Sequence, residues 1–213
     1  QPDVGSEIGF VYRYTDRFGT REEIVSATLG PIENINDEPT GQVQVDGDLR
    51  EGATLEVRTS DIADADGIMP GTPSVQWMRN GVDIAAATGT ALILEQIDVG
   101  ADLSVRYSYV DAFGMIETVT SSALGPVENV NDLPQGMLRI DGIGDQYQTL
   151  TLDPAAIMDT DGIVDGSQAI TWLRNGQAIE GAVGQSYTLT QADVAAQITA
   201  RYTYTDQFGT VER

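Results

Sequence analysis

Strict alternation of hydrophobic and polar side chains predicts that this chain is built from β-strands. In the clearest run, between positions 103 and 110, every second side chain is apolar: Leu103, Val105, Tyr107 and Tyr109. Alternate side chains of a strand point to opposite faces, so these positions define one buried face. Further short apolar runs, broken by Gly, Asn and Asp, lie at 42–47, 53–62, 74–81, 91–95 and 116–127. No segment has a sustained helical period, and about seven strands of this kind indicate an all-β sandwich.

The same pattern returns 95 residues further along the chain. Asp37 and Asp132 are separated by 132 − 37 = 95 residues, and the interval also relates Trp77 to Trp172. It relates the stretches "YTDRFGT", "YVDAFGM" and "YTDQFGT", which contain Asp16, Asp111 and Asp206, and the stretches "DADG" (64–67) and "DTDG" (159–162). The buried strand face therefore has expected counterparts at Ile8, Phe10, Tyr12 and Tyr14, and at Ile198, Ala200, Tyr202 and Tyr204. A fixed period of this length identifies a tandem repeat.

The period divides the chain into three parts. We expect residues 1–38 to be the C-terminal hairpin and linker of a preceding repeat, residues 39–133 to be a complete repeat, and residues 134–213 to be a repeat that lacks its last strand. The sequence is then a slice of a longer array. Because an incomplete sheet edge invites pairing, there are two alternatives. Either the chain continues at both ends, or residues 24–35 of one molecule complete the truncated sandwich of another, head to tail.

The composition excludes several kinds of site. The chain has no Cys and no His, which rules out disulfides, thiolate metal sites and nucleophile systems that depend on His. A pair of catalytic carboxylates would still be available, but the candidate pairs recur in both copies, so we expect no enzyme. The net charge of −22 disfavours nucleic acids and anionic membranes and favours cations. The alternative is that this charge serves only solubility. No long apolar run is present, so we expect no membrane insertion.

Two stretches carry a resemblance to a known family. The first is "WMRNGVDI" followed by "LILEQIDVGADLSVRYSYVD", and the second is "WLRNGQAIEGAVGQSYTLTQADVAAQITARYTYTD". They resemble the bacterial immunoglobulin-like repeats of giant surface adhesins and other large secreted proteins, and the resemblance covers nearly the whole chain. It implies tandem immunoglobulin-like β-sandwiches, an extracellular, secreted or cell-surface location, and a role in cell adhesion or biofilms. The inter-sheet Cys pair of antibody domains is missing.

One end of such a sandwich gathers acidic and amide side chains. In an immunoglobulin-like sandwich the loops cluster at two ends, so we expect the loop after the second strand to lie beside the loop after the sixth. We expect the linker to enter the domain at this same end. The candidate metal ligands are Glu33, Asn34, Asn36, Asp37, Asp64, Asp66 and Asp111, and one repeat later Glu128, Asn129, Asn131, Asp132, Asp159, Asp161 and Asp206.

This mixture of oxygen donors predicts calcium. Ca²⁺ accepts roughly six to eight oxygen ligands and tolerates irregular geometry. The "ND-x-P" linker together with the "DxDG" loop also resembles the inter-domain calcium site of cadherins, which implies that linker and following domain share ions. An EF-hand is excluded, because the position that requires Glu is Val75 when counted from Asp64, and Ile170 when counted from Asp159. The alternative that Asp, Asn and Gly only cap their own turns stays open.

Two functional hypotheses follow. In the first, these are structural extender repeats of a long bacterial adhesin-like protein, and calcium at the junctions between neighbouring repeats of the same chain makes the array rigid. In the second, one copy is a ligand- or carbohydrate-binding module of a secreted protein or enzyme, although no exposed aromatic cluster marks a site. Other recurring residues receive structural roles: turn caps for Asp3, Asp98 and Asp193, core positions for Trp77 and Trp172, and exposed turn positions for Arg79 and Arg174.

Overall fold

The structure is a computed structural model that describes all residues, 1–213, and the chain divides into two compact units. The first unit is Gln1–Glu128 and the second is Asn129–Arg213. The boundary falls inside the linker in which we expected the complete repeat to end, and the predicted three-part division stays a prediction. Both units are built from β-strands, and the only helical turns are the short 3₁₀ helices η1 (Gln96–Asp98) and η2 (Gln191–Asp193).

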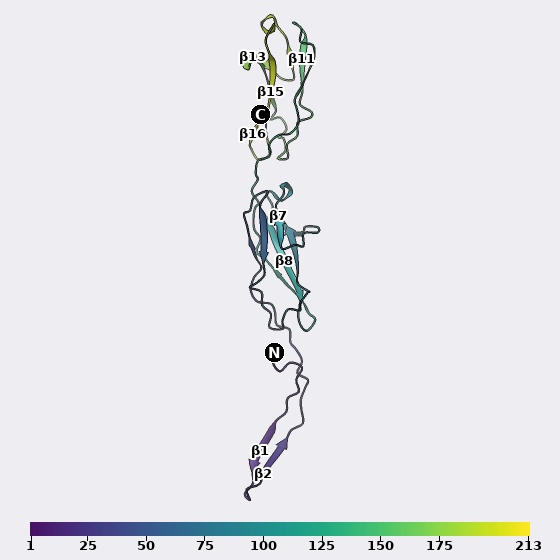
Figure 1. The fold of residues 1–213 in the computed structure, drawn as a ribbon, viewed down its shortest axis with the longest axis vertical. Helices are drawn as coiled ribbons and strands as arrows, with labels where there is room; N and C mark the ends of the chain where they lie inside the picture. Colours follow the sequence, from purple (N-terminus) through teal and green to yellow (C-terminus); the bar gives the residue numbers. More distant parts are fainter. The chain divides into compact units, whose positions relative to one another are not determined.

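The first unit contains a hairpin and a two-sheet sandwich. The hairpin pairs β1 (Val11–Thr15) with β2 (Arg21–Val25). One sheet has the order β3-β4-β7 and the other the order β6-β5-β8-β9. Their strands are β3 (Gln44–Asp46), β4 (Thr54–Arg58), β5 (Ser74–Arg79), β6 (Val82–Asp83), β7 (Ala91–Ile93), β8 (Leu103–Val110) and β9 (Ile116–Thr120). Figure 1 labels one strand of each sheet, β7 and β8, and the buried side chains of both sheets form one hydrophobic core.

The second unit has the same arrangement. Its sheets have the orders β10-β11-β14 and β13-β12-β15-β16. Their strands are β10 (Arg139–Asp141), β11 (Thr149–Asp153), β12 (Ala169–Arg174), β13 (Gln177–Val183), β14 (Ser186–Thr188), β15 (Ile198–Thr205) and β16 (Val211–Glu212). The all-β sandwich predicted from the sequence is therefore confirmed. Position by position, the strand order of one unit matches that of the other.

The Trp residues are at the centres of the two cores, as predicted. The side chain of Trp77 is fully buried, lies opposite Val105 on the neighbouring strand, and packs with Leu55 from the other sheet. Its Nε1–H donates a hydrogen bond of 2.9 Å to the carbonyl oxygen of Gly89. Trp172 is equally buried and donates to the carbonyl oxygen of Gly184 over 3.0 Å. Each indole thus fills its core while its one polar group is satisfied.

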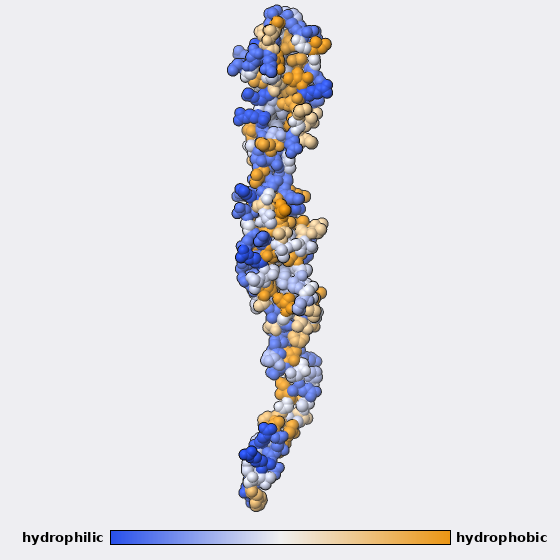
Figure 2. All heavy atoms as spheres, viewed as in Figure 1, coloured by the Kyte–Doolittle hydropathy of each residue, from blue (hydrophilic) through white to orange (hydrophobic).

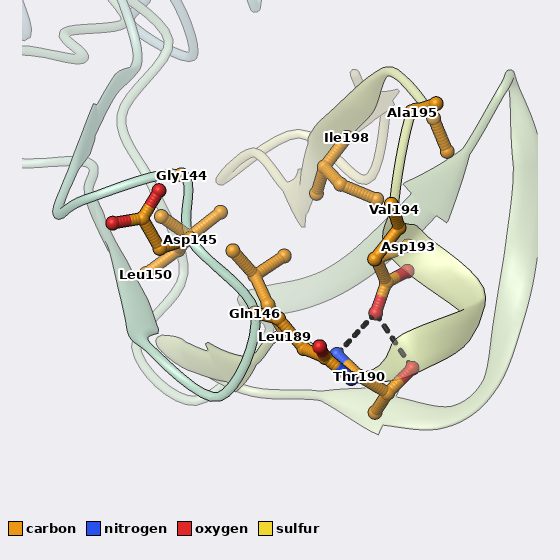
Figure 3. Close-up of a pocket in the computed structure, with 11 residues that line it drawn as sticks. Gly144, Asp145, Gln146, Leu150, Leu189, Thr190, Asp193, Val194, Ala195 and Ile198 are labelled. Atoms are coloured by element: carbon orange, nitrogen blue, oxygen red, sulfur yellow. Dashed lines mark hydrogen bonds between the residues drawn. The ribbon is translucent and has the colours of Figure 1, made fainter.

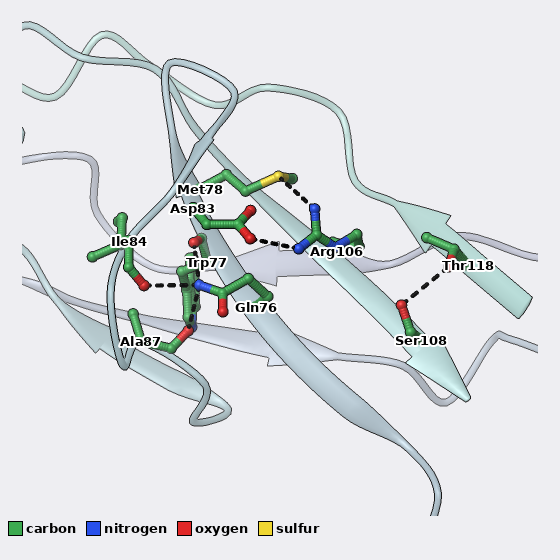
Figure 4. Close-up of polar contacts among 9 residues, drawn as sticks. All are labelled: Gln76, Trp77, Met78, Asp83, Ile84, Ala87, Arg106, Ser108 and Thr118. Carbon is green, nitrogen blue, oxygen red and sulfur yellow. Dashed lines mark hydrogen bonds and ion pairs between the residues drawn. The ribbon is translucent and has the colours of Figure 1, made fainter. Parts of the chain in front are cut away.

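Strand β8 alternates as its sequence predicts, and its outward side chains tie the sheet together. Figure 4 shows two of these contacts: Arg106 donates to Asp83 Oδ2 over 2.7 Å, and the hydroxyls of Ser108 and Thr118 lie 3.1 Å apart. On the neighbouring strand, Gln76 Nε2 donates to carbonyl oxygens of the turn that follows the hairpin loop. The polar half of the alternation therefore holds strand pairs in register.

The apolar face of the first hairpin differs from its counterpart in β8. We expected Ile8, Phe10, Tyr12 and Tyr14 to face inward, but these side chains are 41–65% exposed. In Figure 1 the hairpin β1–β2 has no second sheet against either face, and Figure 2 shows hydrophobic side chains at its surface. The alternation is present, because it is a local property of the strand. The apolar side chains are not buried, because burial requires an opposing sheet.

The prediction that Arg79 and Arg174 are exposed turn residues is wrong. Arg79 donates from Nε to Asp98 Oδ1 over 2.7 Å, and its side chain is only 25% exposed. Asp98 is buried and also accepts the backbone N–H of Glu95, which caps η1. Arg174 and Asp193 form the same pair in the second unit. The Asp residues are caps, as predicted, but each is also one half of a buried ion pair.

The environment of Asp193 favours its ionised form. Burial alone would raise the pKa of this carboxyl group. The backbone N–H of Thr190, the hydroxyls of Tyr187 and Thr190, and the guanidinium of Arg174 outweigh burial and hold the pKa at about 2. The hydrogen bond from Tyr187 to Asp193 is 2.8 Å long. The same contact, after burial itself, raises the pKa of Tyr187.

We expect acid to weaken the second unit between about pH 4 and about pH 2. In the unfolded chain the Asp193 carboxyl takes up a proton near its ordinary pKa of 3.8, whereas in the folded unit it stays ionised to about 2. Its contribution to stability is therefore complete above this window and is lost as the pH falls through it. Urea unfolding of the full chain at a series of pH values measures the effect. Asp193→Asn should flatten the pH dependence in this window, and an unchanged slope would contradict the assignment.

Candidate metal site at the linker

The "DADG" loop of the first unit is shaped by Asp64. Its Oδ1 accepts the backbone N–H of Asp66 over 2.8 Å, and its carbonyl oxygen accepts the N–H of Gly67, whose φ of 84° favours glycine. Its Oδ2 accepts the hydroxyl of Tyr109 over 2.6 Å. Burial, followed by this hydrogen bond, raises the pKa of Tyr109. Asp159 and Tyr204 repeat the arrangement in the second unit. The first Asp of each loop thus positions the second.

The second Asp of each loop holds the linker. Asp66 is 4% exposed, and its Oδ2 accepts the backbone N–H of Asp37 over 2.7 Å. In the second unit Asp161 is 2% exposed and accepts the backbone N–H of Asp132 over 2.7 Å. Carboxylate oxygens of Asp132 and Asp161 lie within 4.8 Å of one another. The sequence correctly predicted that linker and loop meet.

An amide nitrogen links two carboxylates in the first unit. Gln1 Nε2 donates to Asp37 Oδ2 and to Asp66 Oδ1, each over 2.6 Å. The Gln1 amide N–H groups partly offset the negative charge of the two carboxylates. A cation bound to both would offset that charge more completely. The carboxylates of Asp37 and Asp66 therefore both contact one partly positive group, the side-chain amide of Gln1.

The third acidic residue has an oxygen without a partner. Asp111 is fully buried, and its Oδ1 accepts the backbone N–H groups of Phe113 and Met115 over 2.9 and 2.7 Å. Its Oδ2 is buried and has no hydrogen-bond partner. A β-bridge between Ile68 and Asp111 places this residue next to the "DADG" loop. Buried polar atoms are nearly always paired, so this oxygen is a candidate metal ligand.

Asp206 repeats this geometry in the second unit. It is 1% exposed, Oδ1 accepts the N–H groups of Phe208 and Thr210 over 2.8 and 2.7 Å, and the buried Oδ2 has no partner. Burial alone would raise the pKa of Asp206, but the backbone N–H groups of residues 208–210, that of Thr210 first, lower it below its ordinary value. The carboxylate is thus ionised at neutral pH, and its second oxygen remains free to bind a cation. The N–H of Gln207 contacts the carbonyl of Asp161 over 3.3 Å, which joins the two loops.

The donor atoms at each site fit calcium. Each unit has a linker Asp whose N–H is held by a loop Asp, and a buried Asp with an unpartnered oxygen. In the first unit the buried amide Oδ1 of Asn34 also lacks a partner. No nitrogen or sulfur ligand belongs to the set, which suits a hard cation rather than zinc. A role as metal ligands stays a prediction for Asn34, Asp37, Asp66 and Asp111, and in the second unit for Asp132, Asp161 and Asp206.

The chain is similar to solved structures of bacterial adhesins. One is a Ca²⁺-stabilized adhesin of an Antarctic bacterium that binds ice, with 13% identity over 95% of this chain and 53% of that chain and a TM-score of 0.36. Another is a 1.5-MDa bacterial ice-binding adhesin, with 14% identity over 95% of this chain and 70% of that chain and a TM-score of 0.33. This chain thus spans about half the length of the first. At such low scores and identities, the similarities carry no functional argument.

The other comparisons found no relative. No protein-family model matches the chain, and no curated protein is similar to it. None of the helices has the length and hydrophobicity needed to cross a bilayer.

Sequence reasoning missed two Glu residues at the site. Asn36 Nδ2 donates to Glu117 Oε1 over 2.8 Å, and Asn131 Nδ2 donates to Glu212 Oε1 over 2.9 Å. Glu212 is buried. The 95-residue period could have identified both Glu residues, because Glu117 and Glu212 lie 212 − 117 = 95 residues apart. The amide groups of both Asn residues thus point at carboxylates.

Three predicted ligands, Glu33, Glu128 and Asn129, are not among the residues that form the contacts described above. Glu33 is exposed. Glu128 is exposed and belongs to the first unit, where its N–H donates to the Leu49 carbonyl oxygen over 2.8 Å and its carbonyl oxygen accepts the N–H of Glu51 over 2.9 Å. Asn129 belongs to the second unit. A metal-binding role for these three residues stays a prediction.

Proposed function

We propose that the chain is a structural spacer in which calcium fastens each linker to the sandwich that follows it. The observation that carries the proposal is the buried carboxylate pair in each unit. One carboxylate, Asp66 or Asp161, holds the linker backbone, and the other, Asp111 or Asp206, presents an unpaired oxygen. A divalent ion shared between them would satisfy that oxygen and offset the repulsion among the acidic groups.

The linker backbone supports a role in stiffening. Glu128 is hydrogen-bonded to Leu49 and Glu51 of the first unit, and only four positions later Asp132 is hydrogen-bonded to Asp161 of the second. The intervening residues are 129–131. Calcium at Asp132 would fix the far end of this short segment, so the joint would lose most of its conformational freedom. Without the ion, the crowded carboxylates would repel one another and the joint would act as a hinge.

The proposed setting is a long bacterial adhesin-like protein outside the cell, with these sandwiches as its extender repeats. The acidic composition and the absence of Cys and His support a mechanical role over an enzymatic one. Extracellular calcium modules typically bind with dissociation constants of about 10⁻⁴–10⁻³ M, and we expect affinities in that range here.

A calcium titration followed by small-angle X-ray scattering and calorimetry tests the proposal. We expect heat of binding at two sites or more, and a distance distribution that becomes narrower as calcium replaces chelator, because a stiff joint samples fewer arrangements. Magnesium is the control ion, since it requires a nearly ideal octahedral shell and should bind far more weakly. Identical scattering curves in chelator and calcium, with no heat of binding, would refute the proposal.

A further inference from the structure

The linker of the first unit is contacted by a turn that the sequence repeats. The stretches "QPDV" (1–4), "QIDV" (96–99) and "QADV" (191–194) follow one another at intervals of 95 residues, and the last two contain η1 and η2. Figure 3 shows the third stretch, in which Asp193 accepts the backbone N–H and the hydroxyl of Thr190 over 2.6 and 2.8 Å. In all three, the N–H of the Val donates to the carbonyl oxygen of the Gln, over 3.0, 3.2 and 3.4 Å. The first stretch is therefore the same turn.

The first turn lies against its linker as η1 does in the middle of the chain. Val4 forms a parallel β-bridge with Ile32 of the linker. Val99 forms the same bridge with Val127. The Gly that follows each Val donates its N–H to the carbonyl oxygen of the bridge partner, over 2.8 and 2.9 Å. This backbone position is thus a property of the repeat, and it places the side chain of Gln1 at the linker.

The amide nitrogen of Gln1 lies where an ion shared by two carboxylates would lie. Gln1 Nε2 donates to Oδ2 of Asp37 and to Oδ1 of Asp66, each over 2.6 Å. Calcium–oxygen bonds are about 2.3–2.6 Å long, so an ion bound to the same two oxygens would take nearly the same position. The N–H groups and the ion both carry positive charge, and they cannot occupy this position together.

We propose that the Gln1 amide takes the place of the ion when calcium is absent, and that calcium has to displace it. This inference rests on the proposed function of the site. Asp66 is 4% exposed and also accepts the backbone N–H of Asp37, so the two carboxylates are held close together. The amide offsets part of their repulsion and keeps the linker attached at low calcium. Its displacement costs two hydrogen bonds, so Gln1 sets the calcium concentration at which the site fills.

Removal of this amide should have opposite effects with and without calcium. Without the ion, Asp37 and Asp66 lose their common donor, so the linker is held less firmly. With calcium, the ion no longer has to break two hydrogen bonds, so the site fills at a lower concentration. A side chain with only a structural role would weaken the linker in both conditions. The opposite signs therefore distinguish competition from simple support.

Isothermal titration calorimetry of Gln1→Ala with calcium tests the competition. All proteins carry Asp206→Asn, which is expected to silence the second unit, so that the heat reports the first. A Gly-Ser pair precedes residue 1 in each protein, because an N-terminal Gln cyclises and loses its amide. We expect the dissociation constant of Gln1→Ala to fall about tenfold, which corresponds to one hydrogen bond to a charged group.

Gln44→Ala is the matched control for this titration. Gln44 also donates to a carboxylate, Asp61, over 2.9 Å, and neither residue belongs to the linker or to the "DADG" loop. Its substitution should leave the dissociation constant unchanged. An unchanged constant for Gln1→Ala would overturn the inference and leave the proposed function intact. A larger constant would also overturn it, because the Gln1 side chain would then be an oxygen ligand of the ion.

Hydrogen exchange measured by NMR in chelator tests the metal-free state. The N–H of Asp37 donates to Asp66 Oδ2 over 2.7 Å, so its exchange rate reports how firmly the linker is held. In Gln1→Ala we expect this N–H to exchange about tenfold faster than in the wild type in chelator, and at the wild-type rate in saturating calcium. Unchanged exchange in chelator would overturn the inference. If no protein bound calcium, the proposed function would be refuted and the competition with it, even where exchange in chelator still depended on Gln1.

Discussion

Saturating calcium should raise the thermal unfolding midpoint of the second unit by about 10–20 °C. An ion that binds only the folded state at 100 times its dissociation constant contributes about 2.7 kcal/mol, and 1 kcal/mol shifts the midpoint of a domain of this size by about 4–8 °C. The physical reason is that calcium would pair the buried Asp206 oxygen and hold Asp132 and Asp161 together. Differential scanning calorimetry in chelator and in calcium measures the shift.

Asp206→Asn should remove this calcium-dependent shift from the second unit while the first unit keeps its own. The amide retains an oxygen that accepts the N–H groups of Phe208 and Thr210, so the turn is preserved, but the negative charge is lost. Asp111→Asn should have the reciprocal effect on the first unit. Asp165→Asn is the matched control, because Asp165 is exposed and lies in the same unit. If Asp206→Asn kept the full calcium shift, the buried carboxylate would not be a ligand.

Trp172→Ala should lower the free energy of unfolding of the second unit by about 3–5 kcal/mol, as expected for a large aromatic side chain removed from a core. Its indole is fully buried, stacks on Tyr187 with ring centroids 5.7 Å apart, and donates a hydrogen bond to Gly184. Small domains are stable by only a few kcal/mol more than this, so most of the stability of the unit would be lost. Urea unfolding followed by circular dichroism measures the change.

The chain contains its own reporter for the control experiment. Only two Trp residues are present, one in each unit, so the fluorescence of Trp77 in the Trp172→Ala variant reports the first unit alone. We expect its unfolding midpoint to stay close to that of the wild type. Trp172→Phe should cost less than Trp172→Ala, because it retains most of the buried area. A loss below about 1 kcal/mol for Trp172→Ala would show that the core collapses around the missing ring.

The sequence predicted the sandwich because its signals are local and repeated. The alternation in β8 and the φ > 0 turn at Asn80 and Gly81 depend on neighbours in the chain, and both occur in the structure as expected. The meeting of Asp37 with Asp66 was also predictable, because sandwich topology dictates which loops share an end. These features required no knowledge of side-chain geometry.

The polar pairs between distant elements were harder to predict. The contact of Arg79 with Asp98 depends on how η1 turns back toward the end of β5, and that of Asn36 with Glu117 depends on the register of β9. Neither contact can be predicted from the alternation of apolar and polar residues or from the positions of turn residues. The exposure of Tyr12 and Tyr14 was missed for a related reason, because a strand's pattern specifies the face to be buried but not whether a sheet is present to bury it.

The short segment between Glu128 and Asp132 has a mechanical consequence. Four peptide units extend to roughly 14 Å at most, so a pulled chain has little linker to straighten before tension reaches the folded units. On the first unit that tension acts at Glu128, whose β-bridge to Arg50 runs parallel, as does the bridge between Val99 and Val127. Force along the chain would load these bonds in shear, several at once, instead of opening them one by one.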